Sequence, residues 1–292
     1  MSRRTSAPEG QRRCTVRTDD GAALTIVLDG PDPRTAPTTL LLAHGWTLTH
    51  HSWDDVVALV REQHPELAVV RWDQRDHGRS SGGRAGLGLS IHRLGDDLAT
   101  VLAATRPSGR LVLGGHSMGS MTVMAWAADR PEEVAERTDG FLLVSAAAQL
   151  GEARTRWLAL SMRALHRAPH AVRLPRMPPR YGRRGAWGPL VSNETILAAG
   201  RREGWVRARA VGGWYGALMQ HDMRHALELM ATRRVHVVVG DEDRLTPTHR
   251  ADYILAQTPG ATGEVVPGAG HMLLVEHPDR VAEHIHQLLE PL

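Results

Sequence analysis

The stretch Val112-Leu113-Gly114-Gly115-His116-Ser117-Met118-Gly119-Ser120 restricts the range of possible folds of this chain more than any other stretch does. An apolar run leads into it, and apolar residues at helical spacing follow from Met121 to Ala128. The stretch therefore predicts a strand, a tight turn and a helix, with one serine at the apex. Residues 115–119 fit the pattern G-x-S-x-G, the nucleophile elbow. The glycines let neighbouring backbones approach closely while the serine hydroxyl projects from the sheet.

Length and composition indicate a globular protein. The 292 residues suffice for one large α/β domain or for a core with an insertion. Hydrophobic residues make up 42% and charged residues 23%, which argues against wholesale disorder. All 35 basic residues are arginine, against 32 acidic residues, so the formal net charge is only +3. The arginine clusters at 3–13 and 173–184 lie in no recognisable nucleic-acid-binding motif, and we expect no nucleic-acid partner.

The number of cysteines and the length of the apolar segments indicate the cellular compartment of the protein. The single cysteine, Cys14, excludes an intrachain disulfide and fits a reducing environment. Arg3-Arg4 precedes no apolar segment, so it does not indicate an export signal. No run of about 18 apolar residues is present, so we expect no stable membrane insertion. The sequence predicts a soluble, cytoplasmic protein and leaves its oligomeric state open.

Strand and helix patterns alternate along most of the chain. Two short strands are expected around the turn Asp19-Asp20-Gly21. A continuous apolar run, typical of a strand covered on both faces, lies at 39–43, and further strands are expected at 67–72, 140–145 and 235–239. Helical spacing is found at 53–61, 90–104 and 278–289. This alternation predicts an α/β fold with a mostly parallel central sheet flanked by helices.

The alternation stops between about Gln149 and Met230. We therefore expect a flexible tail at 1–13, an α/β core formed by 14–148 and 231–292, and a helical cap or lid inserted at 149–230. Four of the eight tryptophans lie in this insertion: Trp157, Trp187, Trp205 and Trp214. They can line a substrate pocket or form a small core of the insertion itself.

Five segments carry a resemblance to a known family. They are His44-Gly45-Trp46, residues 73–80, Gly115-His116-Ser117-Met118-Gly119, Gly240-Asp241-Glu242-Asp243 and Gly268-Ala269-Gly270-His271. In this order they resemble the α/β-hydrolase fold superfamily, specifically its serine-nucleophile, lidded branch of esterases and lipases. The resemblance covers nearly the whole chain outside the tail and the insertion. It implies the α/β-hydrolase fold and a Ser-His-Asp triad.

A serine hydroxyl is a poor nucleophile near neutral pH and needs a base within hydrogen-bond reach. The base expected here is His271, which lies on a glycine-flanked loop after a late strand, in the chain order serine, acid, histidine. The base in turn needs a carboxylate to fix its tautomer. Asp241, Glu242 and Asp243 compete for this role, and the family pattern implies Asp243. Asp241 and Glu242 are then expected to serve the turn or the solvent.

The resemblance also implies an oxyanion hole formed by the backbone N–H groups of Trp46 and Met118. Residues expected to lie around the substrate pocket are His44, Gly45, His116 and Trp214. In the loop at 73–80 this chain has Asp76 where the family usually has glycine, so the local backbone is expected to differ. His77, in the same loop, is expected to pack and form hydrogen bonds.

No metal or cofactor is expected. The pairs His50-His51 and His221-Asp222 lack a third ligand at a spacing typical of zinc sites, and these residues, with His225, are interpreted as surface or lid residues. The glycines at 82–88 do not form a dinucleotide-binding fingerprint, because no buried strand leads directly into them.

The sequence thus predicts a serine hydrolase that cleaves a carboxylic ester of a small, at least partly hydrophobic substrate through an acyl-enzyme. Alternatives with the same triad are a thioesterase, an amidase or peptidase, and a C–C bond hydrolase. A third possibility is a ligand-binding, receptor-like module of this fold with little turnover, since fold alone does not decide function. A serine at position 117 argues against dehalogenase and epoxide-hydrolase chemistry, which uses an aspartate nucleophile in this fold.

Overall fold

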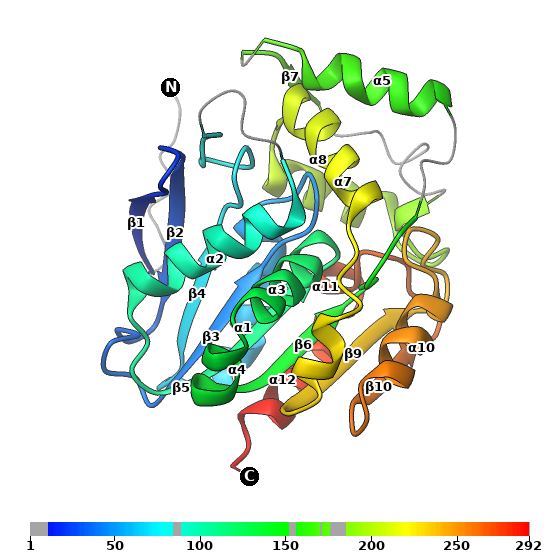
Figure 1. Cartoon of the computed structure of the whole chain (residues 1–292). Coiled ribbons are helices and arrows are strands. Elements are labelled where there is room, and N and C mark those ends of the chain that lie inside the picture. Colours follow the sequence, from blue (N-terminus) through cyan, green and yellow to red (C-terminus); the bar gives the residue numbers. More distant parts are fainter. Residues whose placement is uncertain (1–10, 84–88, 152–155, 170, 176–184, 292) are drawn as a thin grey trace.

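Largely apolar stretches form the central strands, because a strand covered by helices on both faces needs apolar side chains on both. The computed structural model describes residues 11–83, 89–151, 156–169, 171–175 and 185–291. Eight strands pair in the order β1-β2-β4-β3-β5-β6-β9-β10, and Figure 1 shows the twisted sheet they form. The parallel strands are β3 Thr38–Ala43, β4 Ala68–Trp72, β5 Arg110–His116, β6 Thr138–Val144, β9 Arg234–Gly240 and β10 Thr262–Val266.

An antiparallel hairpin forms one end of the sheet. Strand β1, Gln11–Arg17, pairs with β2, Ala23–Asp29, which pairs antiparallel with β4. The expected flexible tail of residues 1–13 is therefore too long, since its last three residues belong to β1; residues 1–10 lie outside the described ranges. The physical reason is that most side chains of this edge strand face water. Its backbone pairs with β2 whatever the side chains are, so no apolar alternation marks it.

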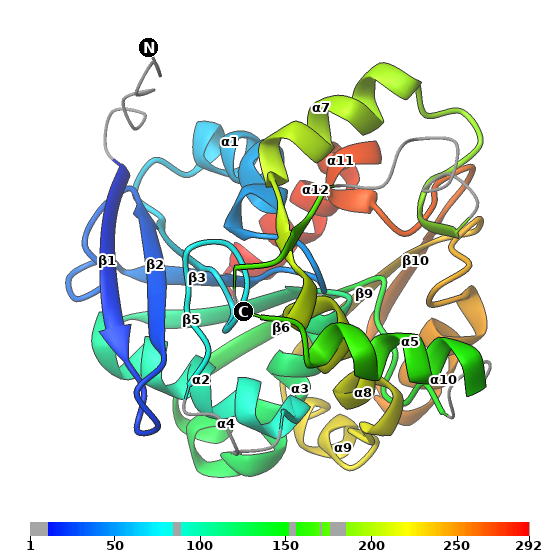
Figure 2. The same cartoon turned by 90° about the horizontal axis from the view of Figure 1, so that it is seen from above.

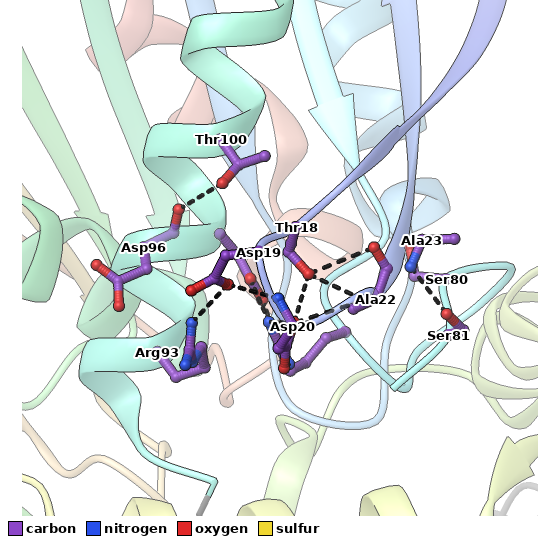
Figure 3. Close-up of polar contacts among 12 residues, drawn as sticks. Thr18, Asp19, Asp20, Ala22, Ala23, Ser80, Ser81, Arg93, Asp96 and Thr100 are labelled. Carbon is purple, nitrogen blue, oxygen red and sulfur yellow. Dashed lines mark hydrogen bonds and ion pairs between the residues drawn. The ribbon is translucent and has the colours of Figure 1, made fainter. Parts of the chain in front are cut away.

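Hydrogen bonds connect the turn of this hairpin to the rest of the core, as Figure 3 shows. The Thr18 hydroxyl donates to the Asp20 carboxylate over 2.5 Å, and Asp19 accepts a hydrogen bond of 3.0 Å from Arg93. The backbone N–H of Ala23 donates to the Ser81 hydroxyl over 2.8 Å. The expected turn at residues 19–21 is confirmed, and side chains hold it against helix α2 (Ile91–Thr105) and the loop after β4.

Helices cover both faces of the sheet, as Figure 2 shows from above. One face carries α1 (Asp54–Gln63), α11 (Leu273–Glu276) and α12 (Pro278–Leu289). The other face carries α2 (Ile91–Thr105), α3 (Met118–Asp129), α4 (Pro131–Arg137), α9 (Ala226–Met230) and α10 (Thr248–Gln257). Within β5, Leu111 and Leu113 face the second layer while Val112 faces the first. The predicted α/β architecture is confirmed.

Local capping explains why some helices match their expected bounds. The Ser90 hydroxyl accepts a hydrogen bond of 3.1 Å from the Arg93 N–H and so caps α2, as its sequence position predicts. Pro278 opens α12 at the first helical position, where proline lacks only an N–H that the helix leaves unpaired. Among the described residues, no helix combines the length and apolar character needed to cross a bilayer.

The segment between β6 and β9 leaves the sheet and returns to it at almost the same place. Gln149 forms an isolated antiparallel bridge with Asp222, and the Met223 N–H donates to the Ala148 carbonyl over 2.8 Å. The two ends of the insertion thus meet at 149 and 222. Helix α9 lies beyond this junction and packs in the same layer as α3, so the expected boundary at Met230 includes a helix of the core.

The insertion contains helices and one small hairpin. Its helices are α5 (Arg156–His166), α7 (Asn193–Glu203) and α8 (Ala208–Gln220), and the two-residue strands β7 (Arg173–Leu174) and β8 (Val206–Arg207) pair antiparallel. The sequence showed no buried strand here, and these two strands are not buried and are too short to show alternation. Trp157 and Trp205 are 81% and 61% exposed, and only Trp214 is fully buried. A core built from all four tryptophans is therefore not formed.

Candidate active site

Ser117 stands at the tip of β5, one residue before α3 begins. Its φ of 53° and ψ of −119° lie in a region that side chains other than glycine rarely occupy. A Cβ on Gly115 would lie 2.3 Å from the Ser120 nitrogen, and one on Gly119 would lie 2.2 Å from the Ala43 oxygen. Both glycines of the motif are thus required for close backbone approach, and the strained turn expected at Ser117 is present.

Asp243 and His271 come together at the same edge of the sheet. Asp243 follows β9, His271 follows β10, and His271 Nδ1 lies 2.8 Å from Asp243 Oδ2. Both side chains are buried. Burial raises the pKa of Asp243, but the charge and hydrogen bond of His271 and the hydrogen bonds of Thr246 outweigh burial and hold it below its ordinary value. The carboxylate is therefore ionised at neutral pH and orients the imidazole.

The two competing acids have other partners. The Asp241 carboxylate accepts a hydrogen bond of 2.7 Å from the Gly268 N–H, and Glu242 is exposed, with Arg244 3.8 Å away. Only Asp243 of the three forms a hydrogen bond with His271. This is the arrangement that the family pattern implied.

Thr246 is a member of this cluster that the sequence did not reveal. Its hydroxyl lies 2.8 Å from Asp243 Oδ2, 2.9 Å from the Ser145 carbonyl and 3.2 Å from His271 Nδ1. The N–H groups of Leu245 and Thr246 both donate to Asp243 Oδ1 over 2.9 Å. The carboxylate is thus fixed on both oxygens. The signal was the spacing of an aspartate and a threonine just before Pro247, a pattern typical of local side-chain-to-backbone hydrogen bonds.

The backbone carbonyl of His271 is also held by side chains. His116 Nε2 lies 2.8 Å from it and the Ser145 hydroxyl 3.1 Å. Burial and the neighbouring His271 lower the pKa of His116 to about 3, so its ring is neutral, and this contact assigns its proton to Nε2. The rings of His116 and His271 are 5.0 Å apart. Because His116 directly precedes Ser117, this contact brings His271 to the serine turn.

Two backbone N–H groups near Ser117 remain available. Within the described ranges, no hydrogen bond uses the N–H of Trp46 or of Met118. A Cβ on Gly45 would lie 2.7 Å from His116 Nδ1, so the loop before Trp46 packs directly on the serine turn. Among the same residues, no hydrogen bond joins the Ser117 hydroxyl to His271. Such contacts are often long in a ligand-free enzyme and tighten when substrate binds.

The loop after β4 supports the Trp46 segment. His77 Nε2 accepts a hydrogen bond of 3.1 Å from the Thr47 N–H, and His77 Nδ1 donates to the Arg75 carbonyl over 2.9 Å. Both ring nitrogens are therefore occupied, which agrees with the packing and hydrogen-bonding role expected for His77. Asp76 has a φ of 64°, a left-handed conformation that suits the glycine usual in the family and that aspartate tolerates better than most residues. An aspartate thus holds a backbone conformation here that glycine adopts readily.

The residues expected around the pocket are buried instead. His44 and Trp214 are 0% exposed and His116 is 1% exposed, and Gly45 is buried too. His44 Nε2 accepts a hydrogen bond from the Gln74 N–H over 2.9 Å, and Trp214 Nε1 donates to the Arg75 carbonyl over 3.2 Å. These side chains support the loops around Ser117, and none offers a surface to a ligand in this structure. The pocket expectation for them finds no support.

The histidines interpreted as surface or lid residues form local contacts. His50 is buried with Nδ1 2.7 Å from Asp73, and His221 is buried between the carbonyls of Leu218 and Ala147. His50 was expected at the surface or in the lid, so its burial in the core is a correction, whereas His221 lies within the insertion. His51 contacts Asp54, Asp222 contacts Arg224, and the His225 ring stacks on His92. No three His, Cys, Asp or Glu side chains within the described ranges are placed to hold a metal ion.

Comparison with known proteins shows the family of this chain. Residues 40–284 match the alpha/beta hydrolase family, and the chain belongs to it. Over 149 residues it is 29% identical to a probable oxidoreductase EphD of Mycobacterium bovis, covering 51% of this chain and 22% of that protein. Over 99 residues it is 31% identical to a pimeloyl-[acyl-carrier protein] methyl ester esterase of Xanthomonas campestris pv. campestris, covering 34% of this chain and 37% of the esterase.

A solved structure matches a larger share of this chain than the curated relatives do. A hydrolase from Pseudomonas aeruginosa superposes with a TM-score of 0.75 at 23% identity, covering 96% of this chain and 98% of that one. At this identity the likeness establishes the fold. The chain spans about a fifth to just over a third of the length of the curated relatives it matches.

Proposed function

We propose that this chain hydrolyses carboxylic esters of small, partly hydrophobic molecules through an acyl-enzyme on Ser117. The observation that carries the proposal is the pair His271–Asp243, 2.8 Å apart, at the sheet edge where the Ser117 turn projects. The partial match to a methyl ester esterase supports ester chemistry. The single cysteine, Cys14, agrees with a place of action in the reducing cytoplasm.

The hydrogen bond between Asp243 and His271 Nδ1 determines how the imidazole acts. With the proton on Nδ1, the lone pair on Nε2 can take the proton of the Ser117 hydroxyl as its oxygen attacks the ester carbonyl carbon. The N–H groups of Trp46 and Met118 then stabilise the negative oxygen of the tetrahedral intermediate. His271 returns the proton to the departing alcohol. A water molecule, deprotonated by His271, releases the acid and restores Ser117.

Aromatic side chains at the candidate oxyanion hole favour a partly hydrophobic substrate. The rings of Trp46 and Tyr215 are 6.0 Å apart, and both residues are half-buried, so part of each surface remains open. Trp46 Nε1 lies 3.4 Å from the Ala210 carbonyl of α8, which ties this ring to the insertion. An apolar acyl or aryl group can pack against these rings next to the N–H groups that bind the oxyanion. We infer that residues 149–222 serve as the cap of the site.

A fluorophosphonate probe tests the nucleophile. Wild type should be labelled, Ser117→Ala should not, and Ser161→Ala, which removes an exposed hydroxyl from α5, should be labelled like wild type. Equal labelling of the Ser117→Ala variant would refute the assignment. A panel of aryl esters and thioesters of graded acyl length, with matching amides, then defines the bond that is cleaved. Saturable binding of a ligand without product release would favour the receptor-like alternative.

A matched pair of aspartate variants tests the acid. Asp243→Asn should lower kcat about 10⁴-fold, because the amide favours the wrong tautomer of the base. Asp241→Asn should change kcat only a few-fold, since Asp241 contacts the Gly268 N–H and not His271. The reverse order of effects would show that the acid is misassigned.

A further inference from the structure

Glu276, the last residue of α11, accepts hydrogen bonds from three backbone N–H groups. Its Oε2 accepts hydrogen bonds from Gly270 over 3.0 Å and from Gly188 over 2.9 Å, and its Oε1 accepts one from Met272 over 3.1 Å. Gly270 and Met272 are the residues on either side of His271. Gly188 belongs to the insertion. One side chain therefore joins the candidate catalytic histidine to a segment far away in the sequence.

The two backbones also touch directly. The Ala186 carbonyl accepts hydrogen bonds from the His271 N–H over 3.0 Å and from the Met272 N–H over 3.2 Å. A Cβ on Gly188 would lie 2.2 Å from the Gly268 oxygen, and one on Gly270 would lie 2.5 Å from the Gly188 nitrogen. Only glycines fit at these two positions. The insertion thus rests on the histidine loop without an intervening side chain.

The chemistry of the Glu276 side chain suits this task. A carboxylate has two acceptor oxygens and no donor, whereas glutamine would turn an NH₂ group towards one of the N–H groups. Glu276 is half-buried, and no cationic side chain of the described ranges forms an ion pair with it. Its charge is balanced by the three peptide dipoles, and hydrogen bonds to an ionised acceptor are stronger than neutral ones.

We propose that Glu276 is a positioning residue that makes the orientation of His271 depend on the docked insertion. Asp243 and Thr246 hold the imidazole of His271, while His116 and Ser145 hold its carbonyl. Glu276 and Ala186 hold the N–H groups of the same loop and connect them to residues 186–188. Movement of the insertion therefore shifts the base. This inference rests on the proposed function of His271.

The rate of fluorophosphonate labelling per active site tests the proposal. Glu276→Gln should slow labelling and lower kcat by about 10- to 100-fold, because small misplacements of catalytic groups have effects of this size. Glu283→Gln is the matched control, since Glu283 lies on α12 and pairs with Arg280 at the surface. A merely structural role would reduce the amount of protein that is labelled and leave the rate per site unchanged. That result would overturn the proposal.

A second variant changes the same contact between the insertion and the histidine loop, this time on the insertion side. Gly188→Ala should displace residues 186–188 from the histidine loop while leaving Glu276 intact. If both residues act through one contact, the double variant should be no slower than the slower single variant, whereas independent effects multiply. Multiplication of the two losses would contradict the proposal. This comparison remains informative even if one variant is less stable, because rates are expressed per labelled site.

Amide hydrogen exchange separates failure of this inference from failure of the proposed function. In Glu276→Gln, exchange at Gly188, Gly270 and Met272 should accelerate at least 10-fold relative to wild type, and Glu283→Gln should leave it unchanged. If wild type is never labelled by the probe, the proposed function fails while exchange still tests the contact. If wild type is labelled and exchange in Glu276→Gln is unchanged, the role of Glu276 is refuted.

Discussion

Mild acid should weaken the fold of this protein before most of its carboxylates titrate. Burial lowers the pKa of His44 and of His116 to about 3, and burial together with His284 and Arg234 lowers that of His236 to about 4. An unfolded histidine titrates near pH 6.5. Between these values the unfolded chain binds protons that the folded chain does not. The free energy of unfolding therefore falls as the pH is lowered below 6.5.

The size of this effect follows from counting protons near pH 5. His44 and His116 contribute about one proton each to the difference, and His236, the most exposed of the three at 7%, contributes less. Asp97 acts in the opposite direction, because burial raises its pKa to about 6 and the folded state then binds the extra proton. Burial also lowers the pKa of His50 and of His286, which act in the same direction as the three histidines, and the net difference is at least between one and two protons. The expected slope is about 2 kcal/mol per pH unit, a large part of a typical folding free energy.

Urea unfolding between pH 5 and pH 7 at constant ionic strength measures this slope. His236→Gln should make the dependence on pH less steep, because it removes one of the histidines whose pKa is lowered in the folded state. His249→Gln is the matched control, since His249 is exposed on α10 and its removal should leave the slope unchanged. A wild-type slope below about 0.7 kcal/mol per pH unit, half a proton, would refute the reasoning.

Two further predictions concern the backbone. Arg106 follows α2 with a φ of 49° and is exposed, so Arg106→Gly should raise the free energy of unfolding by about 1 kcal/mol, and an unchanged or lower thermal midpoint would contradict this. Gly119→Ala should lower the free energy of unfolding by about 1–3 kcal/mol and also abolish most activity, because the added Cβ meets the backbone at Ala43 and His44 before the Trp46 loop. Normal ester turnover by a stably folded Gly119→Ala variant would show that this loop is not needed.

The central sheet was predictable because burial on both faces leaves an unambiguous sequence pattern. Strands β3 and β9 are largely apolar and have nearly the expected bounds. The start of β1 was not predictable, since an exposed edge strand is held by its backbone and carries arginines at positions that a core strand would fill with apolar residues. Strands β7 and β8 contain two residues each, too few for any periodicity.

The candidate site was predictable where backbone geometry constrains the residue type. Glycines flank Ser117 and precede His271, and these constraints are visible in the sequence. Thr246 was missed because its spacing from Asp243 indicates hydrogen bonds within one turn and not the contact with the distant His271. Glu276 was missed because no spacing signal distinguishes it from other polar residues. Trp214 was misjudged for a different reason. An aromatic residue in the insertion can face a ligand or the Arg75 loop, and the sequence does not tell which.

The strand order has a consequence for synthesis of the chain. Strand β6 ends at Val144, but its neighbour β9 begins at Arg234, about 90 residues later, so roughly 5–20 s of translation separate the two. During that interval the apolar edge of β6 has no partner strand, which is the condition under which nascent chains aggregate. Asp243 and His271 emerge from the ribosome later still. The growing chain thus passes its most vulnerable stage before its candidate site can assemble.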